Sequence, residues 1–427
     1  MAASSVPWRR RELAWALYDV ANSAYATTVM VAFFPVFLKQ YWAADIPVTD
    51  STFWLGITNS AAALVALVLS PVLGSLADAG GWKKPLLALF ALLGVAMAAA
   101  LFQVGPGNYP LALVCYGLGM VAFYLGLVFY DALLPSVTEP ARLERVSALG
   151  YGLGYLGGGV LFAINLAMTL QPAWFGLPDA ATAVRWSFLT VAGWWLLFAQ
   201  PLLWWVPEPP TRRAAGLAAV AAGVRQLRAT VLDLRRLKVV MLFLGAYWLY
   251  IDAVDTVAQM AVDYALSLGF GAAGLMTALL ITQLVGVPAT LLYGRLGERF
   301  GARPAILAGL AVYGMLVVWG TQMTRPYEFY GIAVGVGLVQ GGVQALSRAL
   351  YARIIPRDKA GEFFGFMNLL SKFAAVLGPA LVGLVSRATG APRLSMLALL
   401  ILFGAGAALL YRVDVREGER RAAELQG

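Results

Sequence analysis

Residues 74–85 read GSLADAGGWKKP, a short, charged, glycine-rich turn between two long apolar runs. A similar turn, GRLGERFGARP, follows 220 residues later at 294–304. An internal duplication leaves a repeat of this kind, so the sequence predicts two related halves. The chemically matched positions are Gly74 and Gly294, Leu76 and Leu296, Asp78 and Glu298, Gly81 and Gly301, and Lys83 and Arg303.

The composition places most of the chain in lipid. Its 427 residues are 61% hydrophobic and 12% charged, whereas an average soluble domain is about 25% charged. A single cysteine, Cys115, excludes a disulfide framework within the chain. The absence of histidine removes the commonest metal ligand, and we expect no metal site and no cofactor. The net charge of +9 is interpreted as basic loops that set membrane orientation, not as a nucleic-acid surface.

Twelve stretches are long enough to cross a bilayer, which takes roughly 20 apolar residues. The ten-residue alternation of a membrane β-barrel is not seen. The predicted fold is therefore an all-α membrane protein with twelve transmembrane helices in two pseudo-symmetric six-helix bundles. The expected spans are about 14–41, 53–77, 84–104, 109–135, 146–170, 184–206, 239–264, 273–296, 303–323, 328–352, 362–388 and 393–412.

The order of these spans divides the chain into a bundle at 1–206, a linker at 207–238 and a second bundle at 239–427. The linker carries apolar residues at helical spacing among arginines, which is typical of an amphipathic helix on a leaflet. A plain flexible linker is the alternative. Most of the 31 Lys and Arg residues fall in loops on one side of the predicted membrane, so both termini are expected to be cytoplasmic.

Twelve helices in two halves, with a Gly-x-x-x-Asp-x-x-Gly-x-Lys loop between the second and third, resemble the major facilitator superfamily. A narrower resemblance is to its vacuolar (autophagy-related) effluxer-like branch, named for a fungal exporter of neutral amino acids. The loop departs from the superfamily pattern because Ala79 and Trp82 stand where basic residues are common. The stretches that carry the narrower resemblance are WALYDVANSAY (15–25), YDALLP (130–135), GYGLGYLGG (150–158), QGGVQALSR (340–348) and EFFGF (362–366).

Ionisable residues inside membrane helices are costly, so each is a functional candidate. Asp252 and Asp255 share one helical face with Thr256 and Gln259. The resemblance implies that this helix lines the transport cavity, where a carboxylate pair suits proton coupling. Lys372 falls near the middle of its span, where it would hold a substrate carboxylate or exchange a proton with the carboxylate pair. The alternative for Asp252 and Asp255 is a structural pair that is solvated by an outward vestibule. The alternative for Lys372 is a purely structural ion pair.

Asp19, with Asn22 beside it, and Asp131 fall toward the cytoplasmic side of their helices. They are candidates for a gate or an inner binding subsite, or they stabilise helix ends against arginines such as Arg145. Arg348 is another possible partner for these carboxylates, or a candidate clamp for a substrate carboxylate, although snorkelling to the interface is favoured for it. Gln344 is a further candidate for substrate binding, although amide side chains within membrane helices more often join one helix to another.

The two related turns are expected to gate the cytoplasmic side, as the resemblance implies. Gly74 would allow a close approach to the other half, and Asp78 would lie against a helix N-terminus there. Lys83 and Lys84 are expected to hold the loop to the anionic leaflet. The first turn is expected to be the weaker latch because Ala79 replaces a basic residue, while Glu298 and Arg299 keep more of the pattern. The full set of gating candidates is Gly74, Asp78, Gly81, Lys83, Gly294, Glu298, Arg299, Gly301 and Arg303.

No Walker loop or Gly-x-Ser-x-Gly motif is present, so we expect a transporter and no enzyme. The predicted function is secondary active transport of a small solute by alternating access, with proton-coupled export of a neutral amino acid as the best hypothesis. Alternatives are a lipid or drug exporter of the same fold and a non-transporting scaffold or sensor. The expected partners are the lipid bilayer, a small-molecule substrate and protons, without nucleic acid. A monomer in the plasma (inner) membrane is expected.

Overall fold

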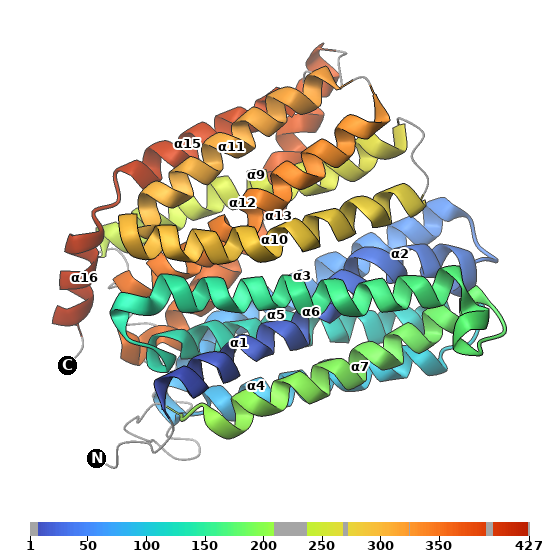
Figure 1. Cartoon of the computed structure of the whole chain (residues 1–427), viewed down its shortest axis with the longest axis horizontal. Coiled ribbons are helices and arrows are strands. Elements are labelled where there is room, and N and C mark those ends of the chain that lie inside the picture. Colours follow the sequence, from blue (N-terminus) through green and yellow to red (C-terminus); the bar gives the residue numbers. More distant parts are fainter. Residues whose placement is uncertain (1–6, 209–236, 268–271, 324, 390–395, 426–427) are drawn as a thin grey trace.

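The computed structural model describes residues 7–208, 237–267, 272–323, 325–389 and 396–425 (Figure 1). Within these ranges some side chains are also left undescribed: those at 258–267, 272–273, 326, 372–377, 379–380, 383 and 386–389. The described residues form helices joined by short turns, without strands. The amphipathic helix predicted within the linker at 207–238 lies outside the described residues from 209 to 236.

The first half contains six membrane-length helical segments. The first segment runs from Trp8 to Trp42 without interruption. It consists of α1 (Trp8–Ala24), η1 (Tyr25–Phe33), α2 (Phe34–Phe37) and η2 (Leu38–Trp42). The others are α3 (Val48–Gly80), α4 (Lys83–Gln103), α5 (Tyr109–Val137), α6 (Leu143–Leu170) and α7 (Ala180–Trp205), with the short 3₁₀ turns η3 (Pro140–Arg142) and η4 (Pro172–Phe175).

The second half repeats this pattern. Its helices are α9 (Lys238–Ser267), α10 (Ala272–Phe300), α11 (Ala302–Gln322), α12 (Pro326–Ile354), α13 (Ala360–Thr389) and α15 (Leu399–Tyr411), with the 3₁₀ turns η5 (Arg357–Lys359) and η6 (Met396–Ala398) and a final helix, α16 (Val415–Glu424).

Each of the twelve predicted spans coincides with one of these helical segments, which confirms the predicted order of spans. By length and apolarity, ten helices among the described residues can cross a membrane, and a bent pair at Met396–Tyr411 and Val415–Glu424 can supply an eleventh. α1 begins at the same end of the bundle as α16 (Figure 1). We call this the termini end. Because successive helices run in opposite directions, α3, α10 and α12 finish at the termini end, and α6 and α13 begin there.

The two related turns share the backbone geometry that the repeat predicts. α3 is followed by Gly81 at φ 67°, and α10 is followed by Gly301 at φ 91°. These positive φ values are accessible to glycine at little cost, which explains why both turns retain it. Beyond the first turn, the Glu208 carboxylate accepts hydrogen bonds of 2.9 Å from the backbone N–H groups of both Lys83 and Lys84. Glu208 therefore caps the N-terminus of α4, and its burial there raises its pKa.

The first span contains two π-helical stretches that the sequence analysis did not predict. They are η1 and η2, on either side of α2, whose first turn contains Pro35. Proline has no backbone N–H to donate and its ring meets a carbonyl of the preceding turn, which disturbs the regular α-helical bonding in η1. π-Helical turns occur frequently at functional sites because they redirect side chains. In this chain, Ala26 and Thr27 of η1 face a central cavity.

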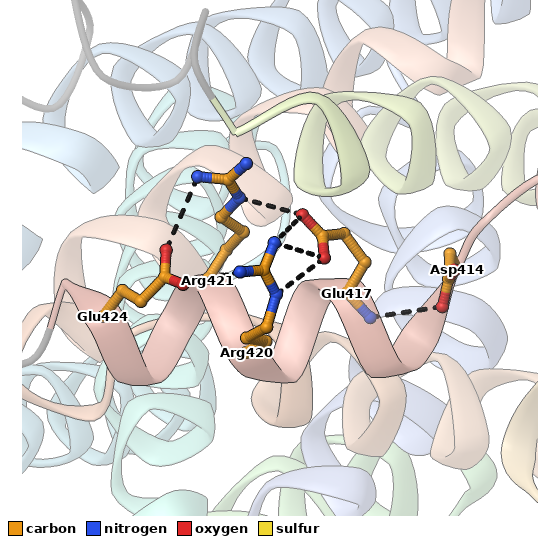
Figure 2. Close-up of polar contacts among 5 residues, drawn as sticks. All are labelled: Asp414, Glu417, Arg420, Arg421 and Glu424. Atoms are coloured by element: carbon orange, nitrogen blue, oxygen red, sulfur yellow. Dashed lines mark hydrogen bonds and ion pairs between the residues drawn. The ribbon is translucent and has the colours of Figure 1, made fainter.

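α16 is a second feature that the sequence analysis missed, since the last predicted span stops at 412. Its polar face is held by pairs between Arg420 or Arg421 and the acidic residues Glu417 and Glu424, at 2.7–3.4 Å (Figure 2). Hydrogen bonds from Arg420 and Arg421 hold the pKa of Glu417 below its usual value. Asp414 caps the helix by accepting a 3.1 Å bond from the Glu417 N–H.

The other face of α16 packs on the second half through small residues. Gly418 is buried, and a Cβ added there would lie 2.8 Å from the Ile354 side chain at the end of α12. We therefore expect Gly418→Val to detach α16 and to raise amide hydrogen exchange throughout it. Gly404→Val is the matched control, because a Cβ at Gly404 meets nothing within 4 Å. Exchange in α16 that matched the wild type in both variants would contradict this packing.

Candidate functional site

A cavity of about 350 Å³ lies between the two halves. Its volume is that of a site for a small molecule. Its walls come from the first span, α5 and α6 on one side and from α9, α10, α12 and α13 on the other, so both halves contribute. Its lining residues are Asp19, Asn22, Ser23, Ala26, Thr27, Phe123, Leu127, Asp131, Tyr151, Tyr155, Tyr247, Ile251, Asp255, Gln283, Gln344, Arg348, Met367, Asn368 and Ser371.

Arg348 links the halves at the termini end of this cavity. The side chain comes from α12 and is 2% exposed. One guanidinium nitrogen lies 3.1 Å from the Asp131 carboxylate of α5, and another lies 3.4 Å from the Asp19 carboxylate of α1. Arg348 also donates two 2.9 Å hydrogen bonds to Ser147 of α6, one to the hydroxyl and one to the backbone carbonyl. One side chain of the second half therefore holds three helices of the first.

Aromatic rings complete the surroundings of the guanidinium. Its central carbon lies 4.3 Å from the ring centre of Tyr151 and 4.7 Å from that of Trp15, at distances where ring faces attract cations. Trp15 stacks on Tyr130, with ring centres 4.4 Å apart. The Tyr130 hydroxyl donates a 2.7 Å hydrogen bond to Asp19. These rings cover faces of the guanidinium and restrict it to a few orientations.

One expectation about Arg348 was wrong, and another is confirmed. Arg348 does not snorkel to the interface, because the two carboxylates and Ser147 satisfy it inside the bundle. Of the two arginines expected as possible partners of Asp19 and Asp131, Arg145 is exposed, whereas Arg348 pairs with both carboxylates.

The other predicted site residues separate into two groups. Asn22, Asp255 and Gln344 line the cavity, and the amide nitrogen of Asn22 is buried without a hydrogen-bond partner among the described residues. Asp252 does not line the cavity. It is buried against α13, where its own turn of α9 lies close to Gly378. The predicted polar face of α9 is thus divided between the cavity and the interface with α13. The side chains of Lys372 and Gln259 lie outside the described residues.

The first related turn forms a buried latch between the halves. The Asp78 carboxylate accepts hydrogen bonds from the backbone N–H groups of Gly361 (3.0 Å) and Glu362 (2.8 Å). These N–H groups belong to the first turn of α13, where the helix dipole favours a negative charge. A Cβ at Gly74 would overlap the carbonyl oxygen of Gly361, so glycine is needed for this approach. The predicted positions of Gly74 and Asp78 agree with this geometry.

Lys83 differs from its expected place at the leaflet. Its ammonium lies 2.7 Å from the Asp78 carboxylate, and the side chain is 2% exposed. The physical reason is that Asp78 is buried and a cation beside it offsets the cost of removing its charge from water. Gly81 supplies the turn that brings Lys83 back to Asp78. The first half, which has Ala79 where a basic residue is common, therefore forms a buried latch. The expectation that its latch is the weaker one is wrong.

The second turn is built differently. Glu298 and Arg299 are exposed, and neither bonds to the first half through a described residue. Gly294 instead lies against Ala148 of α6, where an added Cβ would be 3.4 Å from the Arg145 backbone. Arg303 donates hydrogen bonds to the carbonyl oxygens of Tyr411 (3.3 Å) and Val413 (2.8 Å), within its own half. The expectation that this copy keeps more of the latch is therefore wrong.

An ion pair from a neighbouring helix takes the place of a second Asp78. Arg353 of α12 lies 2.6 Å from the Glu144 carboxylate in the first turn of α6. Arg353 also lies 3.2 Å from Glu419 of α16, so α16 takes part in the same network. Neither Glu144 nor Arg353 was among the predicted site residues. A basic residue near the end of α12 and an acidic residue at the start of α6 were the available signals.

The polar contacts between the halves are unevenly distributed along the bundle. The Asp78 latch, the Arg348 cluster and the Glu144–Arg353 pair all lie at the termini end. At the cavity wall, a 3.2 Å hydrogen bond from Gln283 to Thr27 also links the halves. The cavity is therefore closed more firmly at the termini end.

Comparisons with known proteins agree with this architecture. A family model described as "Vacuole effluxer Atg22 like" matches residues 42–423. An uncharacterised MFS-type transporter of Bacillus subtilis, YxiO, is 35% identical over 409 residues, which covers 94% of each chain. Autophagy-related protein 22-1 of Phaeosphaeria nodorum is 25% identical and covers 96% of this chain and 91% of its own.

Solved structures give the same result for the fold. The human organic anion transporter MFSD10 superposes with a TM-score of 0.71 at 17% identity, covering 95% of this chain and 99% of its own. The proton:xylose symporter XylE superposes with a TM-score of 0.72 at 13% identity, covering 95% of this chain and 96% of its own. At these identities the likeness establishes the fold alone.

The latch predicts a conformational effect of Asp78→Asn. The variant removes the charge facing Lys83 and the N-terminus of α13, and breaking a buried pair of this kind costs about 3–5 kcal/mol. We expect the protein to shift toward a state open at the termini end. A cysteine replacing the buried Ala345 reports this as labelling by a soluble maleimide that is faster by about tenfold or more. Asp50→Asn, at the opposite end of the same helix, is the control. Equal labelling rates in both variants would contradict the role of the latch.

Proposed function

Because the chain belongs to the vacuole effluxer Atg22-like family within the major facilitator superfamily, we propose that it exports a small zwitterionic solute by secondary active transport. The family and the fold are those of integral, multi-pass membrane transporters, not enzymes. Neutral amino acids are the proposed substrates, with a proton as the coupling ion. The observation that carries the proposal is the cavity that both halves line with groups of opposite charge.

The cavity offers partners for both ends of a zwitterion. Arg348 faces the cavity with a planar guanidinium, which binds carboxylates in bidentate fashion. Asp19, Asp131 and Asp255 face the same space and can accept hydrogen bonds from an ammonium group. Asn22 and Gln344 add amide groups from opposite halves. A ligand held by residues of both halves can favour one arrangement of the halves over the other.

The Arg348 cluster suggests how substrate binding and opening are coupled. A substrate carboxylate that binds Arg348 competes with Asp19 and Asp131 for the same guanidinium. A carboxylate released from Arg348 then needs a new partner, because a buried, unpaired charge is unfavourable. A proton or the substrate ammonium can fill this role. Exchange of these partners weakens the contact between the halves and thereby permits opening at the termini end.

The alternative functions make different demands on the cavity. A lipid or drug exporter needs a predominantly apolar site, whereas this cavity is lined by the charged side chains of Arg348, Asp19, Asp131 and Asp255. A scaffold or sensor that moves no solute would gain little from ionisable groups around an internal cavity, because their burial costs free energy.

We further propose that the protein acts as a monomer in the plasma membrane with both termini cytoplasmic. The excess of basic residues in the loops at the termini end supports this orientation. The term "vacuole effluxer" in the family description refers to relatives such as autophagy-related protein 22-1. In the proposed orientation, the more firmly closed end of the cavity faces the cytoplasm.

The purified protein in proteoliposomes tests the proposed substrate. Efflux of radiolabelled alanine, leucine and serine is followed with and without an inward proton gradient, with xylose and a lipophilic dye as comparison solutes. The proposal predicts amino-acid efflux that the gradient accelerates. Movement of the dye alone would favour a drug exporter. Failure to move any solute under either condition would favour the scaffold.

Asn22→Ala tests whether the cavity binds the substrate. The amide nitrogen of Asn22 has no described protein partner, so the substrate is its proposed acceptor. Loss of one hydrogen bond worth about 1 kcal/mol is expected to raise KM roughly fivefold and to leave the yield of folded protein unchanged. Asn108→Ala is the control, because Asn108 lies before α5 and outside the cavity. A KM equal to that of the wild type would remove Asn22 from the site.

A further inference from the structure

A second cavity of about 720 Å³ lies at the termini end, outside the transport cavity. It is bounded by α1, the turn before α6, the first turns of α6, and α10. Because α6 and α10 belong to different halves, this cavity crosses the boundary between them. Its lining residues are Arg9, Glu12, Arg142, Arg145, Val146, Leu149, Leu291 and Arg295.

The charged part of this cavity is strongly basic. Four arginines face one acidic residue, and Arg142 is paired with that residue, Glu12, at 3.0 Å. Glu12 also accepts a 2.6 Å hydrogen bond from Thr138, so it is already occupied. The remaining guanidinium groups, those of Arg9, Arg145 and Arg295, form no ion pair with the described residues. They are suited to an anion, and guanidinium groups match phosphate oxygens well.

The apolar part identifies the kind of anion. Arg145 precedes Leu149 by one helical turn on α6, and Arg295 follows Leu291 by one turn on α10. The two helices run in opposite directions, so on both walls the basic residue lies about 6 Å nearer the termini end than the leucine. Leu291 is 37% exposed, which leaves its side chain open to lipid. A basic rim above an apolar wall matches a phospholipid, whose phosphate lies at the interface and whose acyl chains enter the bilayer.

We propose that this cavity binds an anionic phospholipid, with the phosphate held by Arg145 and Arg295 from opposite halves. Leu149 and Leu291 receive the acyl chain. A lipid that touches α6 and α10 together binds best while these helices are close. Such a lipid therefore favours the state that is closed at the termini end, independently of the solute that is transported.

Lipid titration of the full-length protein in detergent tests the proposal by native mass spectrometry. The probes are a phosphatidylglycerol, a phosphatidylcholine with the same acyl chains, and glycerol 3-phosphate as the headgroup without chains. We expect one tightly bound phosphatidylglycerol and much weaker binding of both comparison molecules. Phosphatidylcholine binding as tightly as phosphatidylglycerol would overturn the charge argument. Glycerol 3-phosphate binding as tightly as the lipid would assign the cavity to a soluble phosphate.

The double variant Arg145→Gln/Arg295→Gln places the lipid in this cavity. Both side chains are exposed and form no ion pair with the described residues, so the variant is expected to elute from size exclusion as the wild type does. Its affinity for phosphatidylglycerol is expected to fall about tenfold or more. Arg412→Gln removes an exposed arginine at the same end, outside the cavity, and is expected to bind as the wild type does. Equal lipid affinity in the double variant and the wild type would overturn the proposal.

Discussion

The buried guanidinium of Arg348 is the constraint on which the arrangement of the two halves depends. An unpaired charge in the interior of a membrane protein costs several kcal/mol, and the partners of this one lie on the opposite half, in Asp19, Asp131 and Ser147. The halves cannot separate at the termini end without exposing these groups or supplying other partners. The aromatic rings of Trp15, Tyr130 and Tyr151 strengthen this dependence because their faces attract the guanidinium cation.

The Asp78 latch and the Glu144–Arg353 pair act in the same direction at the rim of the bundle. They do not touch the cavity, so a substrate does not compete for them directly. This division separates two tasks. The rim contacts set how stable the closed state is, and the Arg348 cluster makes that stability depend on what occupies the cavity. A transporter requires such a dependence, because a ligand shifts an equilibrium only through different affinities for the two states.

The large-scale architecture was accessible from the sequence because it follows from simple physical requirements. Bilayer thickness sets the length of an apolar run, and the repeat at Gly74 and Gly294 indicates the duplication. The position of Asp78 could also be predicted, since a carboxylate beside a close glycine contact suits a helix N-terminus. Asp19, Asp131 and Arg348 were each identified as candidates on the criterion that charges inside a membrane helix are expensive.

The ion pairs between the two halves could not be predicted from the sequence, because they depend on the rotation of each helix about its own axis. Arg348 was expected at the interface, yet the rotation of α12 directs it between α1 and α5. The rotation of α9 was equally unknown from the sequence. Asp252 and Asp255 are three residues apart on this helix, yet only Asp255 lines the cavity. The π-helical segments on either side of Pro35 leave no mark in the pattern of apolar residues. The helix α16 is amphipathic, but it is too short and too charged to be recognised as a membrane span.

Distance measurement by pulsed electron resonance tests the central role of Arg348 most directly. Spin labels are placed at Glu139 and Asp358, two exposed residues at the termini end of opposite halves. Wild-type protein is compared with Arg348→Gln and with the milder Asp131→Asn. If the cluster holds the halves together, both variants will populate longer distances than the wild type, and Arg348→Gln will do so to the greater extent. Distance distributions that remain the same in all three proteins would contradict this account.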